Sequence, residues 1–383
     1  MNGEMNYMKF ILAPDSFKES MTSKDACNAM ERGIKKVIKD AICIKVPMAD
    51  GGEGTVEALV EATEGRFVSA VVTDPLGHRK INATYGILGN GEKAIIEMAS
   101  ASGIHLVEGK NRNPLITTTY GTGELILDAI NRGIKHIIIG IGGSATNDGG
   151  AGMIQALGAH LLDKEGKELN FGGSELIKLN TIDLTNFDKR LNDVIFEVAC
   201  DVNNPLIGEN GASRIFGPQK GATEDMIIQL DEALANYAEV IKRELGIDVA
   251  NVEGAGAAGG VGAALLAFFN GRLKSGIELI IKHTDLENKI KEADFVFTGE
   301  GSIDSQTIFG KTPMGVASVA KKSGVKTIAF AGKIGEGAEN LYDIGINSIF
   351  GIIRGVCSLE EALKNGEINL EKTVENVVRT LIL

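Results

Sequence analysis

The feature that most constrains the fold of this sequence is a recurring unit, in which a short apolar run ends in a polar loop before a helix begins. The first run, Lys9–Ala13, stops at Pro14-Asp15-Ser16, and a helix with one apolar stripe is predicted from about Ser23. A second run, Cys43–Val46, leads into the loop Ala49–Thr55 and another helix. Short strands that alternate with helices are typical of an α/β fold with a parallel sheet.

The pattern changes in the middle of the chain. Three successive strands are predicted at 68–73, 80–88 and 94–98, joined by turns, whereas strand–helix alternation returns toward the C-terminus. A length of 383 residues also favours two domains. We therefore predict a discontinuous Rossmann-like α/β domain of residues 8–67 and 286–383, an inserted second α/β domain of residues 68–285, and an active site in the cleft between them. Residues 1–7 are expected to be an unstructured leader.

Composition narrows the class of protein. A net charge of −12 argues against nucleic acid or an anionic membrane as partner, because phosphate-rich surfaces require a basic face. No run is long and apolar enough for a membrane helix, and no secretory signal is visible. The four cysteines lie far apart, which suits a reducing cytoplasm. The five scattered histidines suggest neither a zinc site nor a histidine-based triad.

Polar loops rich in Gly, Asp, Asn, Ser or Thr follow several predicted strands. In open α/β sheets, ligands bind beyond the carboxyl ends of the strands. We expect five such loops to converge on one site, although each alone could be a simple turn: Ala13–Lys18, Ala49–Thr55, Gly140–Gly152, Cys200–Pro205 and Thr298–Thr312.

The loop that begins at Gly140 allows two interpretations. Gly140–Ala145 fits the dinucleotide pattern G-x-G-x-x-A, and the acidic Asp163 follows at about the required distance, so a nicotinamide-dependent hydroxy-acid oxidoreductase is an alternative function. However, Asp163 lies in a predicted turn, and the residues after Ala145 are polar for a packed helix. An anion-binding nest of backbone N–H groups, with Asn147 and Asp148 facing the cleft, is the favoured interpretation.

Two further glycine-rich segments carry weaker signals. Gly254–Gly259 matches G-x-G-x-x-G, but no clear strand precedes it, and close helix packing explains it equally well. Phe309–Thr312 resembles the tail of a phosphate-binding P-loop, although Ser305 stands where the first glycine is required. Lys311 in this segment can still neutralise a phosphate, or it can be an ordinary surface lysine.

Charged residues in these loops supply what phosphoryl transfer needs: cations, a hydroxyl-activating base and carboxylates that hold Mg²⁺. Some of them can equally serve as turn or helix-cap residues. The basic candidates are Lys18, Arg214, Lys220 and Lys311, and the acidic candidates are Asp15, Asp50, Asp148, Asp201 and Asp304.

Eight motifs together resemble the bacterial two-domain glycerate kinase family, in order over nearly the whole chain. One departure is Ser302, where members of that family often have arginine. If that arginine binds phosphate in the family, another basic residue such as Lys311 would have to do so here. The matching segments are 13–18, 49–55, 121–126, 141–153, 199–206, 211–222, 254–260 and 298–307.

The resemblance implies an ATP- and Mg²⁺-dependent kinase that phosphorylates D-glycerate, with 2-phosphoglycerate the favoured product. We predict Asp201 as the general base, with Asp148 second and Lys18 assisting. The predicted nucleotide-binding residues are Gly142, Gly143, Ser144, Asn147, Gly299, Glu300, Gly301 and Lys311. The predicted substrate contacts are Asp15, Ser16, Asn203, Arg214 and Lys220, and the predicted Mg²⁺ ligands are Asp50 and Asp304.

Overall fold

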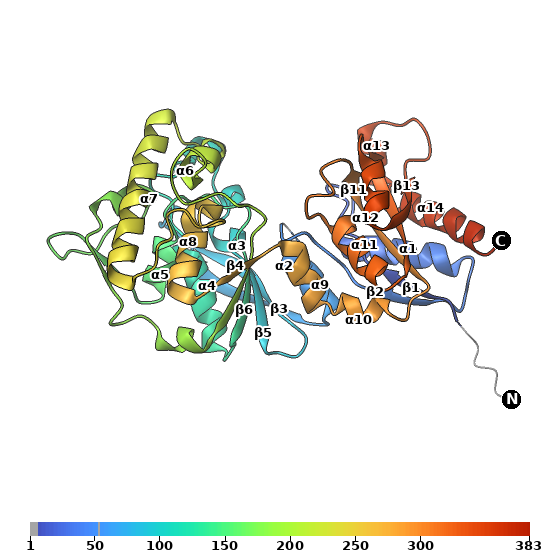
Figure 1. The fold of residues 1–383 in the computed structure, drawn as a ribbon, viewed down its shortest axis with the longest axis horizontal. Helices are drawn as coiled ribbons and strands as arrows, with labels where there is room; N and C mark the ends of the chain where they lie inside the picture. The colour runs from blue at the N-terminus through green and yellow to red at the C-terminus, as the bar shows by residue number, and fades with distance from the viewer. Residues whose placement is uncertain (1–6, 53) are drawn as a thin grey trace. The chain divides into compact units, whose positions relative to one another are not determined.

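The computed structural model describes residues 7–52 and 54–383 and divides the chain into two compact units (Figure 1). The first unit combines the described residues up to Glu64 with Ser275–Leu383, and the second is Gly65–Lys274. Residues 1–6 of the predicted leader lie outside the described residues. The division after Lys274 places α9 (Gly276–His283) in the first unit, because α9 packs against helices of that unit and Gly276 lies against the backbone of Asp50.

The first unit is built on a five-stranded parallel sheet with the strand order β13-β12-β11-β1-β2. N-terminal and C-terminal strands lie side by side in it, since Phe10 of β1 pairs with Phe295 of β11 (Figure 1). The strands are β1 (Lys9–Leu12), β2 (Ile42–Lys45), β11 (Phe295–Ile303), β12 (Lys326–Ile334) and β13 (Ile346–Gly351).

Helices cover both faces of this sheet. On one face, Phe10, Phe297 and Phe330 pack against α1 and α14, and on the other face Ala329 and Ala331 pack against α11 and α12. The helices of the unit, besides α9, are α1 (Ser23–Lys35), α2 (Thr55–Ala62), α10 (Leu286–Ile290), α11 (Thr312–Lys322), α12 (Leu341–Ile344), α13 (Leu359–Lys364) and α14 (Gly366–Leu381).

The second unit contains a six-stranded mixed sheet with the order β10-β9-β6-β5-β4-β3, and β7 pairs antiparallel with β8 in a separate two-stranded sheet. The strands β5, β6, β9 and β10 run parallel, whereas β4 is antiparallel to its neighbours. The strands are β3 (Arg66–Thr73), β4 (Lys80–Ile87), β5 (Lys93–Glu97), β6 (His136–Gly140), β7 (His160–Leu162), β8 (Thr181–Asp183), β9 (Ile195–Ala199) and β10 (Arg272–Lys274).

One large apolar core joins this sheet to its helices. Ile137 and Ile139 of β6 and Phe196 and Val198 of β9 supply its centre, because alternate side chains of a strand point to the same face. The helices are α3 (Ala99–Ser102), α4 (Tyr120–Asn131), α5 (Ala151–Ala156), α6 (Ala212–Phe216), α7 (Glu224–Leu245) and α8 (Ala257–Phe269).

The predicted α/β class is confirmed, and so is the single open sheet that joins N-terminal and C-terminal strands. One prediction was wrong in detail. The segment from Thr298 was expected to be a loop, but β11 continues through it to Ile303, because Gly299, Glu300 and Ser302 stay in register with β12. Within the described residues, no helix combines the length and apolar character needed to cross a membrane.

Candidate active site

The first unit brings two acidic side chains together where its strand order reverses. β1 lies between β11 and β2. The chain continues from β1 to β2 on one side, and the later strands β11, β12 and β13 lie on the other side, so the β1–β11 pair is the topological switch point of the sheet. Ligands of open α/β sheets bind beyond the carboxyl ends of such strands. Asp15 lies in the loop after β1, beyond Ala13 and Pro14, and its backbone N–H donates to the carbonyl of Gly299, next to Glu300 in β11.

Two threonine hydroxyls hold these carboxylates. Thr312, the first residue of α11, donates from Oγ1 to Asp15 Oδ2 at 2.6 Å. Thr307 donates from Oγ1 to Glu300 Oε1 at 2.9 Å. The Lys311 ammonium lies 3.9 Å from Glu300 Oε2, too far for a direct hydrogen bond but close enough to act on its charge.

Burial and mutual repulsion make the carboxyl groups of this cluster hold their protons to a higher pH than usual. Burial, reinforced by the charge of Asp50, raises the pKa of Asp15 to about 6, although the Thr312 hydrogen bond opposes it. Burial also raises the pKa of Glu300 to about 7; Lys311 and Thr307 lower it, and Asp15 and Asp50 raise it further. Three carboxylates that repel one another in a partly desolvated site form a set of oxygen donors suited to a divalent cation such as Mg²⁺.

The other predicted residues of the first unit lie around this cluster. Ser16 donates its backbone N–H to Asp15 Oδ1, and the exposed Lys18 lies in the same loop, whose backbone lies 3.5 Å from the position of a Cβ built on Gly301. Asp304 accepts the backbone N–H of Gln306 and so caps the turn after β11. Its predicted role as an Mg²⁺ ligand stays a prediction, as do the phosphate contacts of Gly299 and Gly301, which lie in the strand.

In the second unit, the loop after β6 presents two exposed glycines above a buried polar network. Gly142 and Gly143 are exposed, and a Cβ on Gly142 would meet only open space. The residues that follow, Ser144 to Gly150, are all buried. Gly142 and Gly143 are therefore the part of the predicted anion nest that a ligand can reach.

Asp148 forms the centre of the buried network. Its Oδ2 accepts the backbone N–H and the hydroxyl of Thr119, both at 2.8 Å, and the N–H of Gly152 at 3.2 Å, while Oδ1 accepts the N–H of Gly150 at 3.2 Å. Burial raises the pKa of Asp148, and these hydrogen bonds oppose that shift. The side chain is fully buried, so these four hydrogen bonds shape the loop, and the predicted catalytic role of Asp148 stays a prediction.

Lys220 is the cation of this network. Its Nζ donates to Ser144 Oγ at 2.8 Å and to the carbonyl of Thr146 at 2.7 Å, and only 2% of the residue is exposed. Burial lowers the pKa of Lys220 to about 7, against the raising effect of the Asp148 charge. Lys220 thus holds the loop through two hydrogen bonds, and its predicted contact with substrate stays a prediction.

The glycine-rich segment 254–260 supports the same loop from the other side. The carbonyl of Gly259 accepts the N–H of Gly149 at 2.9 Å, and a Cβ on Gly259 would lie 2.1 Å from the carbonyl oxygen of Thr146. Asn147 is equally enclosed, with its Nδ2 donating to Ser213 Oγ at 2.9 Å. The packing interpretation of this segment is therefore the one the geometry supports.

The dinucleotide interpretation of Gly140–Ala145 does not match the local structure. The next helix, α5, begins only at Ala151, so the glycines do not open a helix as that fingerprint requires. Asp163 accepts the backbone N–H groups of Glu165 and Lys167 within a turn, where it caps the turn and does not end a second parallel strand of a nucleotide-binding unit.

The remaining predicted residues of the second unit are exposed. Asp201 and Asn203 lie in the loop after β9, and Arg214 lies in α6, where its charge acts on Asp231. Exposure leaves all three available to a substrate.

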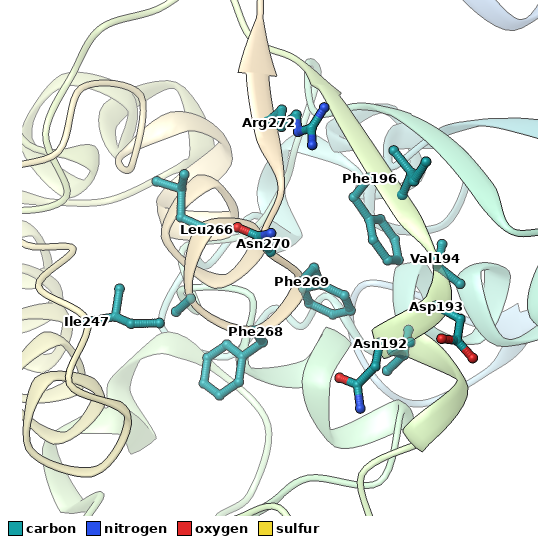
Figure 2. A pocket seen from close by; sticks show the side chains of 13 residues that line it. Asn192, Asp193, Val194, Phe196, Ile247, Leu266, Phe268, Phe269, Asn270 and Arg272 are labelled. Carbon is teal, nitrogen blue, oxygen red and sulfur yellow. The ribbon is translucent and has the colours of Figure 1, made fainter.

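A cavity of about 600 Å³ lies at the opposite ends of β9 and β10 from the loop that carries Asp201. Figure 2 shows that the rings of Phe196, Phe268 and Phe269 line it, with Asn192 at its rim. Because ligands of α/β sheets bind at the carboxyl ends of strands, this cavity is not the candidate active site.

Sequence reasoning missed the hydroxyl partners, Thr312, Thr307 and Thr119, and the raised pKa of Glu300. Thr312 follows Lys311 in the segment that resembles the tail of a P-loop, so its position was visible in the sequence. Its partner, Asp15, was not, because the two residues meet only through the β1–β11 pairing.

Comparison with known proteins identifies relatives over nearly the whole chain. A family model described as the glycerate kinase family matches residues 10–382. The chain is 52% identical to glycerate 2-kinase of Escherichia coli K12 and 50% identical to glycerate kinase of Bacillus subtilis 168, each time over 98% of both chains. The crystal structure of a Salmonella typhimurium LT2 protein, assigned as glycerate kinase 2, superposes with a TM-score of 0.90 at 51% identity and covers 98% of both chains.

Replacement of Asp148 by alanine is expected to destabilise the protein by about 3 kcal/mol or more, because four donors and the buried Lys220 ammonium would lose their acceptor or counter-charge. Urea unfolding measures this. Asp163→Ala, in an exposed turn of the same unit, is the control and is expected to cost less than about 1 kcal/mol. Equal effects of the two substitutions would contradict the structural role of Asp148.

Replacement of Glu300 by glutamine is expected to change how stability depends on pH. The folded-state pKa of Glu300, about 7, exceeds its ordinary value of 4.5, so the folded state binds the proton more tightly. This contribution is complete below pH 4.5 and is lost as pH rises through 7. Relative to wild type, Glu300→Gln should therefore gain about 2 kcal/mol between pH 5 and pH 8, measured by urea unfolding in the presence of a chelator. The exposed Glu360→Gln should follow wild type, and a Glu300→Gln curve parallel to wild type would refute the assignment.

Proposed function

The chain belongs to the glycerate kinase family, and from this premise we propose that it transfers the γ-phosphoryl group of ATP to D-glycerate, with the 2-hydroxyl as the favoured acceptor. The observation that carries the proposal is the cluster of Asp15, Asp50 and Glu300 with Lys311 at the switch point of a parallel sheet. The preference for the 2-position rests on the Escherichia coli relative, which is named a 2-kinase.

We assign Mg²⁺ to the carboxylates of the first unit. Asp15, Asp50 and Glu300 offer oxygen ligands, and the raised pKa values of Asp15 and Glu300 are the behaviour of a site that lacks a compensating positive charge. When bound, Mg²⁺ neutralises phosphate charge. The chain's own groups orient these ligands, since Thr312 and Thr307 each fix one carboxylate oxygen, and Lys311 adds a cation beside Glu300.

Asp201 is the proposed general base. It is exposed at the carboxyl end of β9, where an aspartate can accept the proton of a substrate hydroxyl. Asn203 and Arg214 are the proposed substrate contacts of the same unit, and Gly142 and Gly143 offer backbone N–H groups to an anion. Lys220 and Asp148 hold that loop in shape.

The proposal is tested by ADP release with ATP and Mg²⁺ in the presence of D-glycerate, lactate or tartronate. We expect glycerate-dependent ADP that disappears when Mg²⁺ is chelated, and no change of NADH absorbance with any of the three acids. Phosphorus NMR of the product should show phosphate on the 2-hydroxyl. Absence of glycerate-dependent ADP would refute the kinase activity, and phosphate on the 3-hydroxyl would refute the regiochemistry alone.

Replacement of Asp201 by asparagine is expected to lower kcat by about 10²-fold or more, with a smaller effect on KM, because the amide cannot accept the hydroxyl proton. Steady-state kinetics with D-glycerate measures both constants. Asp193→Asn, which lies just before the same strand β9 at its other end, is the matched control and should leave kcat unchanged. Near-wild-type turnover of Asp201→Asn would remove this residue from the mechanism.

A further inference from the structure

In the sheet of the first unit, the carboxyl end of β12 extends further than that of the outermost strand, β13, and we call this offset the step. β12 stays paired with β11 out to Ile334, which lies opposite Ile303. On its other side, the register of β12 with β13 ends at Ala331 opposite Gly351, and one more bond runs from the N–H of Ile352 to the carbonyl of Ala331. Lys333 and Ile334 therefore extend beyond the end of β13.

Exposed aliphatic side chains lie at the end of β12 and in the chain that follows β13. Ile334 is 47% exposed and Ile353 is 46% exposed, and Val356, in the segment between β13 and α13, is fully exposed. A Cβ built on Gly351 would lie 3.7 Å from Ile334 Cδ1, so the end of β12 and the end of β13 are in contact. Clustered exposed apolar side chains mark a binding surface.

Two cations flank the same surface. Lys333 and Arg354 are exposed, and the side chain of neither forms an ion pair or hydrogen bond within the described part of the chain. Lys333 is the register partner of Ser302 in β11, so its backbone lies beside the strand that carries Glu300. Glu300 itself lies opposite Ala331, so Lys333 is two residues further along β12 than the partner of that carboxylate.

We propose that this step is the nucleotide subsite: the adenine base lies on Ile334, Ile353 and Val356, and Lys333 and Arg354 contact the phosphates. The inference rests on the proposed function, because it names the place where the ATP of that reaction binds. A flat apolar base joined to an anionic chain matches an aliphatic surface flanked by free cations, and the adjoining carboxylates suit the Mg²⁺ that accompanies the phosphates.

Two substitutions distinguish the contribution of the adenine base to binding from that of the phosphates. Val356→Asp and Lys333→Ala should each weaken the binding of a ribose-labelled fluorescent ADP by about fivefold or more and raise the KM for ATP, with the KM for D-glycerate unchanged. Inorganic tripolyphosphate, used as a competitor, should lose affinity for Lys333→Ala and keep it for Val356→Asp. Lys326→Ala, the exposed lysine at the opposite end of the same strand β12, is the matched control and should bind like wild type.

The outcomes distinguish this subsite from the reaction. If wild type makes ADP with glycerate while Val356→Asp and Lys333→Ala bind the labelled ADP like wild type, the subsite is wrong and the kinase activity stands. If wild type releases no ADP with glycerate but the two variants lose nucleotide affinity, the subsite stands and the reaction is wrong. Equal losses in Lys326→Ala would also overturn the subsite, because the effect would then be one of general charge.

Discussion

The pairing of β1 with β11 is the contact on which the candidate site depends. These strands are separated by almost three hundred residues of sequence, yet Phe10, Ile11 and Leu12 lie in register with Phe295, Val296 and Phe297. The pairing continues beyond the strand into the bond from Asp15 N–H to the carbonyl of Gly299. Asp15 thereby comes to lie near Glu300. Burial raises the pKa of both carboxyl groups, and the charge of Asp15 adds to the rise in the pKa of Glu300. A shift of this register by one residue would turn the side chains to the other face and would dissolve the cluster.

The second unit solves a different physical problem, which is how to hold a glycine-rich loop in one shape. Exposed glycines lose much conformational entropy on ordering, so a loop of this kind needs strong support. Lys220 and Asp148 provide it from inside the protein, through hydrogen bonds to Ser144, Thr146, Gly150 and Gly152. Inside a protein such charged hydrogen bonds are strong, but loss of one partner is costly. The ionic network thus fixes the backbone at Gly142 and Gly143, which a ligand can reach.

The sequence predicted the elements better than their contacts. Apolar runs followed by polar loops located most of the strands, because burial on both faces of a parallel strand requires continuous apolar residues. The register of Gly299 and Glu300 with β12 was not predictable, since glycine and glutamate are typical of loops and only the neighbouring strand keeps them extended. Thr312 illustrates the same limit in the site: its identity was visible, whereas its bond to Asp15 depends on the long-range pairing. Local pattern specifies secondary structure, but the chemistry of a side chain depends on partners brought by topology.

Residues that look equivalent in the sequence differ in how deeply their charged groups are buried. Asp15 and Asp148 both follow a buried strand in a polar loop, and both have a raised pKa because of burial. Asp148 is fully buried, and its two carboxylate oxygens accept four hydrogen bonds, so its charge stabilises the backbone of the loop. Asp15 is less enclosed and is repelled by Asp50, so its negative charge remains available for a cation. The same contrast distinguishes Lys220, which donates to the loop, from Lys311, whose ammonium stays at 3.9 Å from Glu300 and is more exposed. A charged residue whose hydrogen-bonding groups are not all occupied by other residues of the protein is therefore the better candidate for binding phosphate or metal.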